Sequence, residues 1–187
     1  MRRPARGGRL RNQGNVPMFW RGRKVCSPAA GATARMHAMV RTARITDAEA
    51  IAGLVNHYAE RGRMLHRSLE SVYESLRDFL VHGPDGQVDG CVALVLGWRE
   101  LGEIRSLAVA PDRQGRGIGA ALVRRAIEAG RELGLQRVFV LTYEPAFFER
   151  FGFRVVDKDT LPGKVWRDCI HCPHADDCRE IAMVLDL

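Results

Sequence analysis

A glycine-rich segment offers the clearest chemistry in this sequence. It stands between an apolar run, residues 104–109, and a stretch from Ala120 to Ile127 whose apolar residues recur at helical spacing. Its residues are Gln114, Gly115, Arg116, Gly117, Ile118 and Gly119. Glycines let backbone N–H groups approach a ligand, and the first turn of a helix adds unpaired N–H groups and a positive dipole end. We therefore expect the loop to hold the pyrophosphate of a cofactor.

Two other phosphate-binding motifs fit this loop less well. Gly115, Gly117 and Ala120 have the spacing of the dinucleotide fingerprint, but in that fold the glycines follow the strand at once. Here residues 110–113 intervene. A P-loop needs Lys followed by Ser or Thr after the glycines, and this sequence has neither at that place.

The elements that must position the loop can be read from periodicity and turn residues. A first helix, capped by Thr46 and Asp47, should reach Tyr58, and a second, capped by Ser68, should run to about Leu80. The expected strands cover residues 40–45, 88–96, 104–109 and 137–141, and a short helix covers 145–150.

This order of elements resembles the GNAT N-acetyltransferases. Their acetyl-CoA motif reads Gln or Arg, two residues, Gly, one residue, Gly or Ala, which Gln114, Gly117 and Gly119 match. The following strand, the short helix and the Gly-Phe at residues 152–153 extend the resemblance over roughly residues 40–156. It implies acetyl-CoA as cosubstrate and an α/β fold of the α+β type. The mixed, mostly antiparallel sheet would be splayed at the acetyl-CoA site, with helices on both faces.

Composition indicates one domain, residues 39–187, preceded by a basic tail. The chain has 187 residues and 46% hydrophobic content, enough for one core. No apolar run approaches the ~20 residues of a membrane span, so we expect a soluble protein without a membrane partner. Residues 1–38 hold eight Arg, one Lys and no acid; removing these nine from 29 basic residues leaves 20, against 22 acidic ones.

The tail has three interpretations. It is rich in Gly, Pro and Arg and lacks an apolar period, so we expect disorder. It is a start placed too far upstream, a nucleic-acid-binding arm, or a targeting segment of the mitochondrial kind. We expect nucleic-acid binding only through residues 1–38.

Acetyl transfer needs a base for the attacking amine and donors for the thioester carbonyl. The resemblance places the base at Glu103, at the start of the central strand; the alternative is a solvated charge. Backbone N–H groups near Leu107, Ala108 and Val109 would polarise the carbonyl, as in relatives where this strand is bulged.

The leaving thiol lacks the usual proton donor. Many GNAT enzymes have a Tyr in the helix before Gly-Phe, where this chain has Phe147 and Phe148. Either Tyr143 supplies the proton or the thiolate leaves unaided, which a thiol pKa of about 8.5 allows; Tyr143 is otherwise an ordinary tyrosine. We expect Phe147 and Phe148 to pack against the pantetheine arm or the core.

A narrower resemblance concerns the acetyltransferase domain of the bacterial N-acetylglutamate synthases and their short relatives. It rests on residues 62–68, 139–142, 148–153 and 161–169. It implies acetylation of the α-amino group of an amino acid, L-glutamate first, as in the opening step of arginine biosynthesis. Arg67 would then meet a substrate carboxylate, which suits the forked donors of a guanidinium. Arg105 is a second candidate without family support, and a surface ion pair is the alternative for both.

Two departures keep other functions open. The longer synthases carry an amino-acid-kinase-like domain ahead of the acetyltransferase domain, and this chain has no room for one. They also have a C-terminal Arg-x-Ser phrase, and this chain has Asp-Cys-Arg-Glu at residues 177–180 instead. Glutamine, another amino acid, a protein N-terminus or a polyamine are therefore alternative acceptors. A non-catalytic acetyl-CoA sensor or an RNA-associated protein is the alternative outside enzymes, and a homodimer stays open.

A cysteine-rich loop, residues 158–179, has two interpretations. Four of its residues could form a tetrahedral zinc site: Cys169, Cys172, His174 and Cys178. Reduced thiols are the alternative, and zinc is not the favoured cofactor. The five cysteines of the chain are an odd number, which argues against an extracellular disulfide framework and for the cytoplasm.

Overall fold

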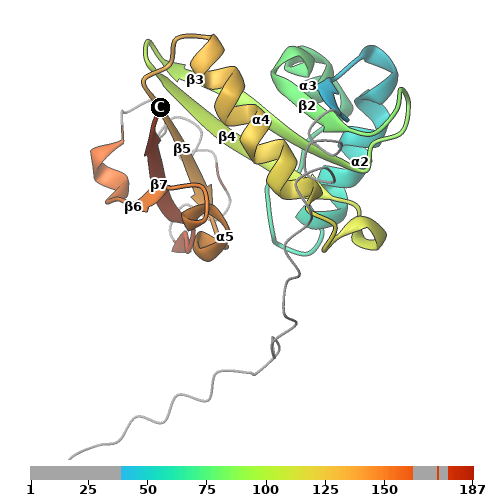
Figure 1. The fold of residues 1–187 in the computed structure, drawn as a ribbon. Helices are drawn as coiled ribbons and strands as arrows, with labels where there is room; N and C mark the ends of the chain where they lie inside the picture. The colour runs from blue at the N-terminus through green and yellow to red at the C-terminus, as the bar shows by residue number, and fades with distance from the viewer. Residues whose placement is uncertain (1–38, 162–171, 173–176) are drawn as a thin grey trace, which may run out of the picture.

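The central sheet joins seven strands in the order β1-β2-β3-β4-β5-β7-β6 in a computed structural model that describes residues 39–161, 172 and 177–187 (Figure 1). The strands are β1 Val40–Thr42, β2 Phe79–His82, β3 Gly90–Trp98, β4 Leu101–Val109, β5 Arg137–Thr142, β6 Arg154–Val155 and β7 Ile181–Asp186. The helices are α2 Ala48–Ala59, α3 Leu69–Glu74, α4 Ile118–Glu132 and α5 Pro145–Glu149, with 3-10 turns η1 Ile45–Asp47, η2 Leu76–Asp78, η3 Pro111–Arg113 and η4 Lys158–Thr160.

The sheet is antiparallel except where β4 meets β5. These two strands run parallel and pair at three positions, from Leu101 opposite Arg137 to Glu103 opposite Phe139. Six residues of β4 follow Glu103 without a partner on β5. The predicted mixed, splayed sheet is therefore confirmed, and the splay begins at Glu103.

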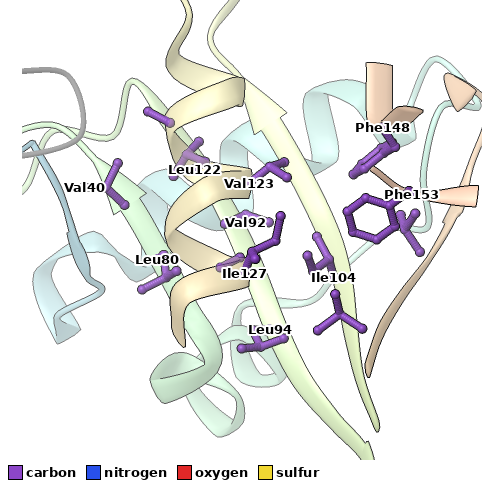
Figure 2. Close-up of a cluster of buried hydrophobic side chains, with 14 of the residues drawn as sticks. Val40, Leu80, Val92, Leu94, Ile104, Leu122, Val123, Ile127, Phe148 and Phe153 are labelled. Atoms are coloured by element: carbon purple, nitrogen blue, oxygen red, sulfur yellow. The ribbon is translucent and has the colours of Figure 1, made fainter. Parts of the chain in front are cut away.

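Helices cover both faces of the sheet, as predicted. Figure 1 shows α4 lying across β3 and β4, and Figure 2 shows Leu122, Val123 and Ile127 of α4 beside Val92, Leu94 and Ile104 of the strands. The opposite face packs on α2 and α3, where Ile51, Val55 and Val72 meet other strand residues. The alternation of side chains along each strand sends neighbours to these two cores. None of the helices in the described residues is long and apolar enough to span a membrane.

The second helix is shorter than the sequence predicts. Ser68 does cap it, accepting a hydrogen bond from the Ser71 N–H at 3.2 Å, but the helix ends at Glu74 rather than near Leu80. Phe79 and Leu80 instead belong to β2, which is buried along its whole length between β1 and β3. A buried strand is apolar at consecutive positions, so its pattern cannot be told from that of a buried helix.

Of the two residues predicted to cap the first helix, Asp47 is the N-cap residue of α2, but its side chain does not act as a cap. β1 ends at Thr42, and the Asp47 side chain makes no cap hydrogen bond to α2. Asp47 is buried and accepts hydrogen bonds from the Arg41 guanidinium at 2.6 and 2.9 Å and from the Arg44 N–H at 2.8 Å. These bonds hold the pKa of Asp47 down to about 2, with burial opposing them. A buried carboxylate takes the arginine partner because leaving its charge unpaired would cost more than leaving the helix uncapped.

Candidate active site

A bulge in β4 shapes the splayed edge. Between the pairs Ala93–Arg105 and Cys91–Ala108, β4 has one more residue than β3. Ser106 takes up the extra length with a φ of 53°, a left-handed conformation that is uncommon outside glycine. The bulge shifts the alternation of the strand, so Leu107 and Val109 pack on the α4 side while Ala108 packs on the α2 side. These three residues thus lie on the edge that β5 leaves uncovered, where the carbonyl donors were predicted.

The glycine loop meets the start of α4, as its sequence indicates. Gly117 is the N-cap residue of α4 with φ 86°, and Gly115 has φ 74°, so both occupy left-handed backbone that favours glycine. Gln114 and Arg116 are exposed, whereas the Ile118 side chain is buried in the core. No acidic side chain lies in the first turn of α4. The helix itself therefore does not neutralise the positive end of its dipole, which faces the loop.

The two neighbouring phenylalanines have different surroundings. Phe148 is buried and packs edge-on against Phe153, so the core is the place for its side chain. Phe147 is half-buried, and its ring lies 3.5 Å from the position that a Cβ on Gly119 would take. Val109 lies at a similar distance from the same point, 3.6 Å. Phe147 therefore lies beside both the loop and the end of β4, and its contact with the pantetheine arm stays a prediction.

Glu103 lies inside β4, two residues after its start, rather than opening the strand as predicted. Its side chain is 18% exposed, and its Oε2 atom lies 3.5 Å from Nη1 of Arg105. Glu103 pairs with Phe139 at the last paired position before the splay. A freely solvated charge would be far more exposed. The geometry therefore does not support the alternative that Glu103 is only a solvated charge.

Arg67 and Arg105 lie around a common carboxylate, Asp78. Burial raises the pKa of Asp78, and the positive charges of Arg105 and Arg67 oppose that rise. The Arg67 guanidinium donates to Ser75 Oγ at 3.2 Å and lies over the Phe79 ring at 5.7 Å. The structure thus brings together the two arginines, Glu103 and Asp78. Asp78 was missed because its sequence position was assigned to the second helix.

Asn56 is another residue that the sequence did not single out. Its side-chain amide donates to the Arg67 carbonyl at 2.8 Å and accepts from the Arg67 N–H at 2.9 Å. These two hydrogen bonds hold the backbone at Arg67 against α2. Asn is a common turn and cap residue, so its type alone gave no signal.

Tyr143 follows β5 and is 38% exposed. Burial of part of its ring and the negative charges of Glu180, Cys178 and Cys172 raise its pKa, while Arg179 lowers it. A phenol in this setting keeps its proton at neutral pH. The geometry accords with a proton donor but equally with an ordinary tyrosine, so its catalytic role stays a prediction.

The proposed zinc ligands fall partly outside the described residues. Cys169 and His174 are among those not described, whereas Cys172 and Cys178 are half-buried. Lys158 Nζ lies 3.2 Å from Cys178 Sγ. Within the part of the chain that the structure describes, no group of three or more His, Cys, Asp or Glu could hold a metal ion. The zinc site therefore stays untested. Arg179, considered as a replacement for the Arg-x-Ser phrase, is exposed and pairs with Asp177 at 2.9 Å.

Comparisons with known proteins show the family of this chain. The model of the acetyltransferase (GNAT) family matches residues 48–153. An uncharacterised N-acetyltransferase of Chlorobaculum tepidum is 46% identical over 148 residues, which is 79% of this chain and 96% of the relative. An amino-acid acetyltransferase of Mycobacterium tuberculosis is 44% identical over 131 residues, 68% of this chain and 75% of the relative.

Solved structures give the same result. A Mycobacterium tuberculosis protein in complex with CoA and the ligand NLQ has a TM-score of 0.68 and 38% identity, covering 79% of this chain and 98% of that one. N-acetylglutamate synthase from Neisseria gonorrhoeae, complexed with CoA and N-acetyl-glutamate, has a TM-score of 0.71 and 31% identity. The match covers 79% of this chain and 34% of the synthase, so the likeness concerns one part of that longer enzyme.

The chain belongs to the GNAT acetyltransferase family. It is an acetyl-CoA-dependent N-acetyltransferase of the amino-acid acetyltransferase kind.

Proposed function

We propose that this enzyme transfers the acetyl group of acetyl-CoA to the α-amino group of L-glutamate, the reaction of an N-acetylglutamate synthase in arginine biosynthesis. The observation that carries the proposal is the pair of Glu103 and Arg105, 3.5 Å apart where β4 separates from β5, with Arg67 as a second guanidinium whose charge acts on the same Asp78 carboxyl as that of Arg105. Two guanidiniums suit the two carboxylates of glutamate, and one carboxylate suits its ammonium group. The names of the Mycobacterium and Neisseria relatives support the same acceptor class.

Glu103 would remove the proton from the α-ammonium group, directly or through a water. The α-ammonium group of a free amino acid stays largely protonated at neutral pH because its own carboxylate lies beside it, so the reaction needs a base at this place. The neutral nitrogen then forms the C–N bond at the thioester carbonyl while backbone N–H groups near Leu107 and Val109 stabilise the oxygen.

Collapse of the tetrahedral species breaks the C–S bond and releases CoA as a thiolate, and the nitrogen loses its second proton to solvent as the amide forms. That thiolate takes a proton from Tyr143 or from solvent. Because a thiol pKa lies near 8.5, the thiolate is an adequate leaving group without a dedicated acid. Loss of Tyr143 is therefore expected to slow the reaction less than loss of Glu103.

One observation favours glutamine as a second acceptor. The charges of Arg67 and Arg105 both act on the Asp78 carboxyl, so the two arginines already have an acidic neighbour before substrate binds. An acceptor with one carboxylate and a neutral side-chain amide would leave that balance in place. Glutamine is thus the alternative to test first.

Thiol release from acetyl-CoA tests the proposal. Purified protein is assayed with glutamate, glutamine, other amino acids and polyamines, as wild type and as Arg67→Ala. We expect turnover with glutamate, and a rise in KM of about 100-fold in the variant if a charged hydrogen-bonded pair worth about 3 kcal/mol is lost. Arg131→Ala, an exposed change at the far end of α4, is the matched control. Turnover with glutamate that is unchanged in Arg67→Ala would remove Arg67 from the acceptor site.

A further inference from the structure

Tyr58, near the end of α2, touches two parts of the acetyl-CoA site at once. Its phenol Oη donates a hydrogen bond to the Val109 carbonyl at 2.5 Å and accepts one from Nε2 of Gln114 at 2.6 Å. Val109 ends the bulged strand β4, and Gln114 begins the glycine loop. The spacing of Tyr58 within α2 predicts only a core residue, but its hydroxyl reaches beyond the core.

These two contacts flank the connection between strand and loop. Ala110 and η3 form this connection, and its backbone is held by the hydrogen bonds Ala110 N–H to Asp89 O at 2.8 Å and Arg113 N–H to Ala110 O at 2.8 Å. Tyr58 bonds Val109, which precedes Ala110, and Gln114, which directly follows η3. The position of the pyrophosphate loop relative to the carbonyl-binding edge of β4 therefore depends on the Tyr58 hydroxyl.

Tyr58 has no proton to spare for catalysis. A phenol carries a single hydrogen, and here it is donated to the Val109 carbonyl. The remaining lone pair receives the Gln114 amide. The hydroxyl thus donates one hydrogen bond to the protein and accepts one from it, as expected for a residue that positions other groups.

The same turn of α2 carries Asn56, which serves the other substrate. Asn56 holds both backbone groups of Arg67, at 2.8 and 2.9 Å. Residues 56 and 58 are two positions apart near the helix C-terminus, and each bonds a segment far away in the sequence. The last turn of α2 thus contacts the cofactor loop through one side chain and the acceptor segment through another.

We propose that the last turn of α2 positions both substrates, with Tyr58 setting the acetyl-CoA loop and Asn56 setting the acceptor arginine. The Asn56 half rests on the proposed function, because it assumes that Arg67 binds the acceptor. The Tyr58 half needs only acetyl-CoA binding at the loop. The two halves therefore predict different kinetic effects for two neighbouring residues.

The Tyr58 half is tested by calorimetric titration of the protein with acetyl-CoA in the absence of any acceptor. Tyr58→Phe keeps the ring and removes the hydroxyl, and we expect acetyl-CoA binding to weaken about five- to tenfold, as for loss of one hydrogen-bonded link. Tyr73→Phe, on the exposed side of α3, is the matched control and should bind as wild type. Thermal unfolding of each variant verifies that it is folded.

Gln114→Leu removes the hydrogen bond between Gln114 and Tyr58 from the side of Gln114. Because Gln114 is exposed, this substitution should not disturb folding. It should weaken acetyl-CoA binding by a similar factor, and the double variant should be little worse than either single one, because all three lose one shared interaction. Wild-type affinity in both single variants, or full additivity in the double variant, would overturn the role of Tyr58.

The Asn56 half is tested by steady-state kinetics with whichever amino acid the enzyme acetylates. Asn56→Ala should raise KM for the acceptor about tenfold and leave the acetyl-CoA affinity unchanged, whereas Tyr58→Phe should show the reverse. An Asn56→Ala effect confined to acetyl-CoA, or no effect on either substrate, would overturn this half. If no amino acid is acetylated, the proposed function fails while the acetyl-CoA titrations still decide the role of Tyr58.

Discussion

Arg105 Nη1 lies 3.5 Å from Glu103 Oε2, and the two side chains come from the same face of β4, two residues apart. At this distance the two side chains form an ion pair. The pair therefore joins the candidate base to a candidate carboxylate-binding group. Its position at the last paired residues before the splay places both beside the uncovered edge of β4.

Replacement of Glu103 tests its role as base. Glu103→Gln keeps the shape and removes the charge, and we expect kcat to fall about 10²- to 10⁴-fold with little change in acetyl-CoA affinity. Glu74→Gln, an exposed change on α3, is the control. A loss of kcat below about threefold would mean that another group or water removes the proton.

The bulge makes Ser106 a specific test of the backbone at the carbonyl site. Ser106→Gly should fold and keep activity, because glycine adopts a positive φ without steric cost. Ser106→Val should lower the free energy of unfolding by about 1–2 kcal/mol and reduce kcat, since a β-branched residue is strained there. Chemical denaturation gives the first quantity and thiol release the second. Equal stability of the two variants would contradict the strain.

The loop glycines can be tested separately from the bulge. Gly117→Ala forces a Cβ into a left-handed N-cap with φ 86°, at a cost of about 1–2 kcal/mol. We expect weaker acetyl-CoA binding in a calorimetric titration. Gly53→Ala is the control, because a Cβ on that α2 glycine would meet nothing within 4 Å. Unchanged acetyl-CoA affinity in Gly117→Ala would show that the loop geometry is not required.

Asp47 predicts how stability depends on acid. Its pKa is lowered to about 2 by the Arg41 hydrogen bonds, so its contribution is present above the unfolded pKa of about 3.9 and is lost as pH falls toward 2. By linkage the contribution is about 2 kcal/mol. Unfolding free energies measured between pH 5 and 2 should fall less steeply in Asp47→Asn, which starts less stable. Parallel curves for wild type and variant would contradict this assignment.

Deletion of residues 1–38 separates catalysis from the basic tail. Every site residue named for acetyl transfer lies beyond residue 39, so a chain beginning at Met39 should keep its thiol-release activity. Any salt-dependent binding of RNA should disappear with the nine basic residues. Loss of acetyl transfer on deletion would show that the tail contributes to the enzyme.

The sequence predicted the parts of the site that depend on local chemistry. Gly115 and Gly117 occupy left-handed backbone, Ser68 caps its helix, and the loop opens α4, because glycine conformation and cap preferences act within a few residues. The splay of β4 from β5 was also predicted, from the family resemblance. The glycine conformations and the helix cap need no knowledge of distant contacts.

The errors arose where distant contacts decide local structure. Phe79 and Leu80 join a buried strand because β1 and β3 flank them. The Asp47 side chain makes no cap hydrogen bond to α2 because its carboxylate accepts hydrogen bonds from Arg41. Asn56 and Asp78 act through segments that the fold alone brings close. No local sequence pattern predicts such residues, since the tertiary structure determines their partners.

The product of the reaction tests the central claim most directly. The enzyme is incubated with isotopically labelled acetyl-CoA and an equimolar mixture of free amino acids, a peptide with a free N-terminus and a polyamine, and the labelled products are identified by mass spectrometry. We predict that the label appears on the α-nitrogen of glutamate, with glutamine as the next product. Label on the peptide or the polyamine, with none on a free amino acid, would contradict the account.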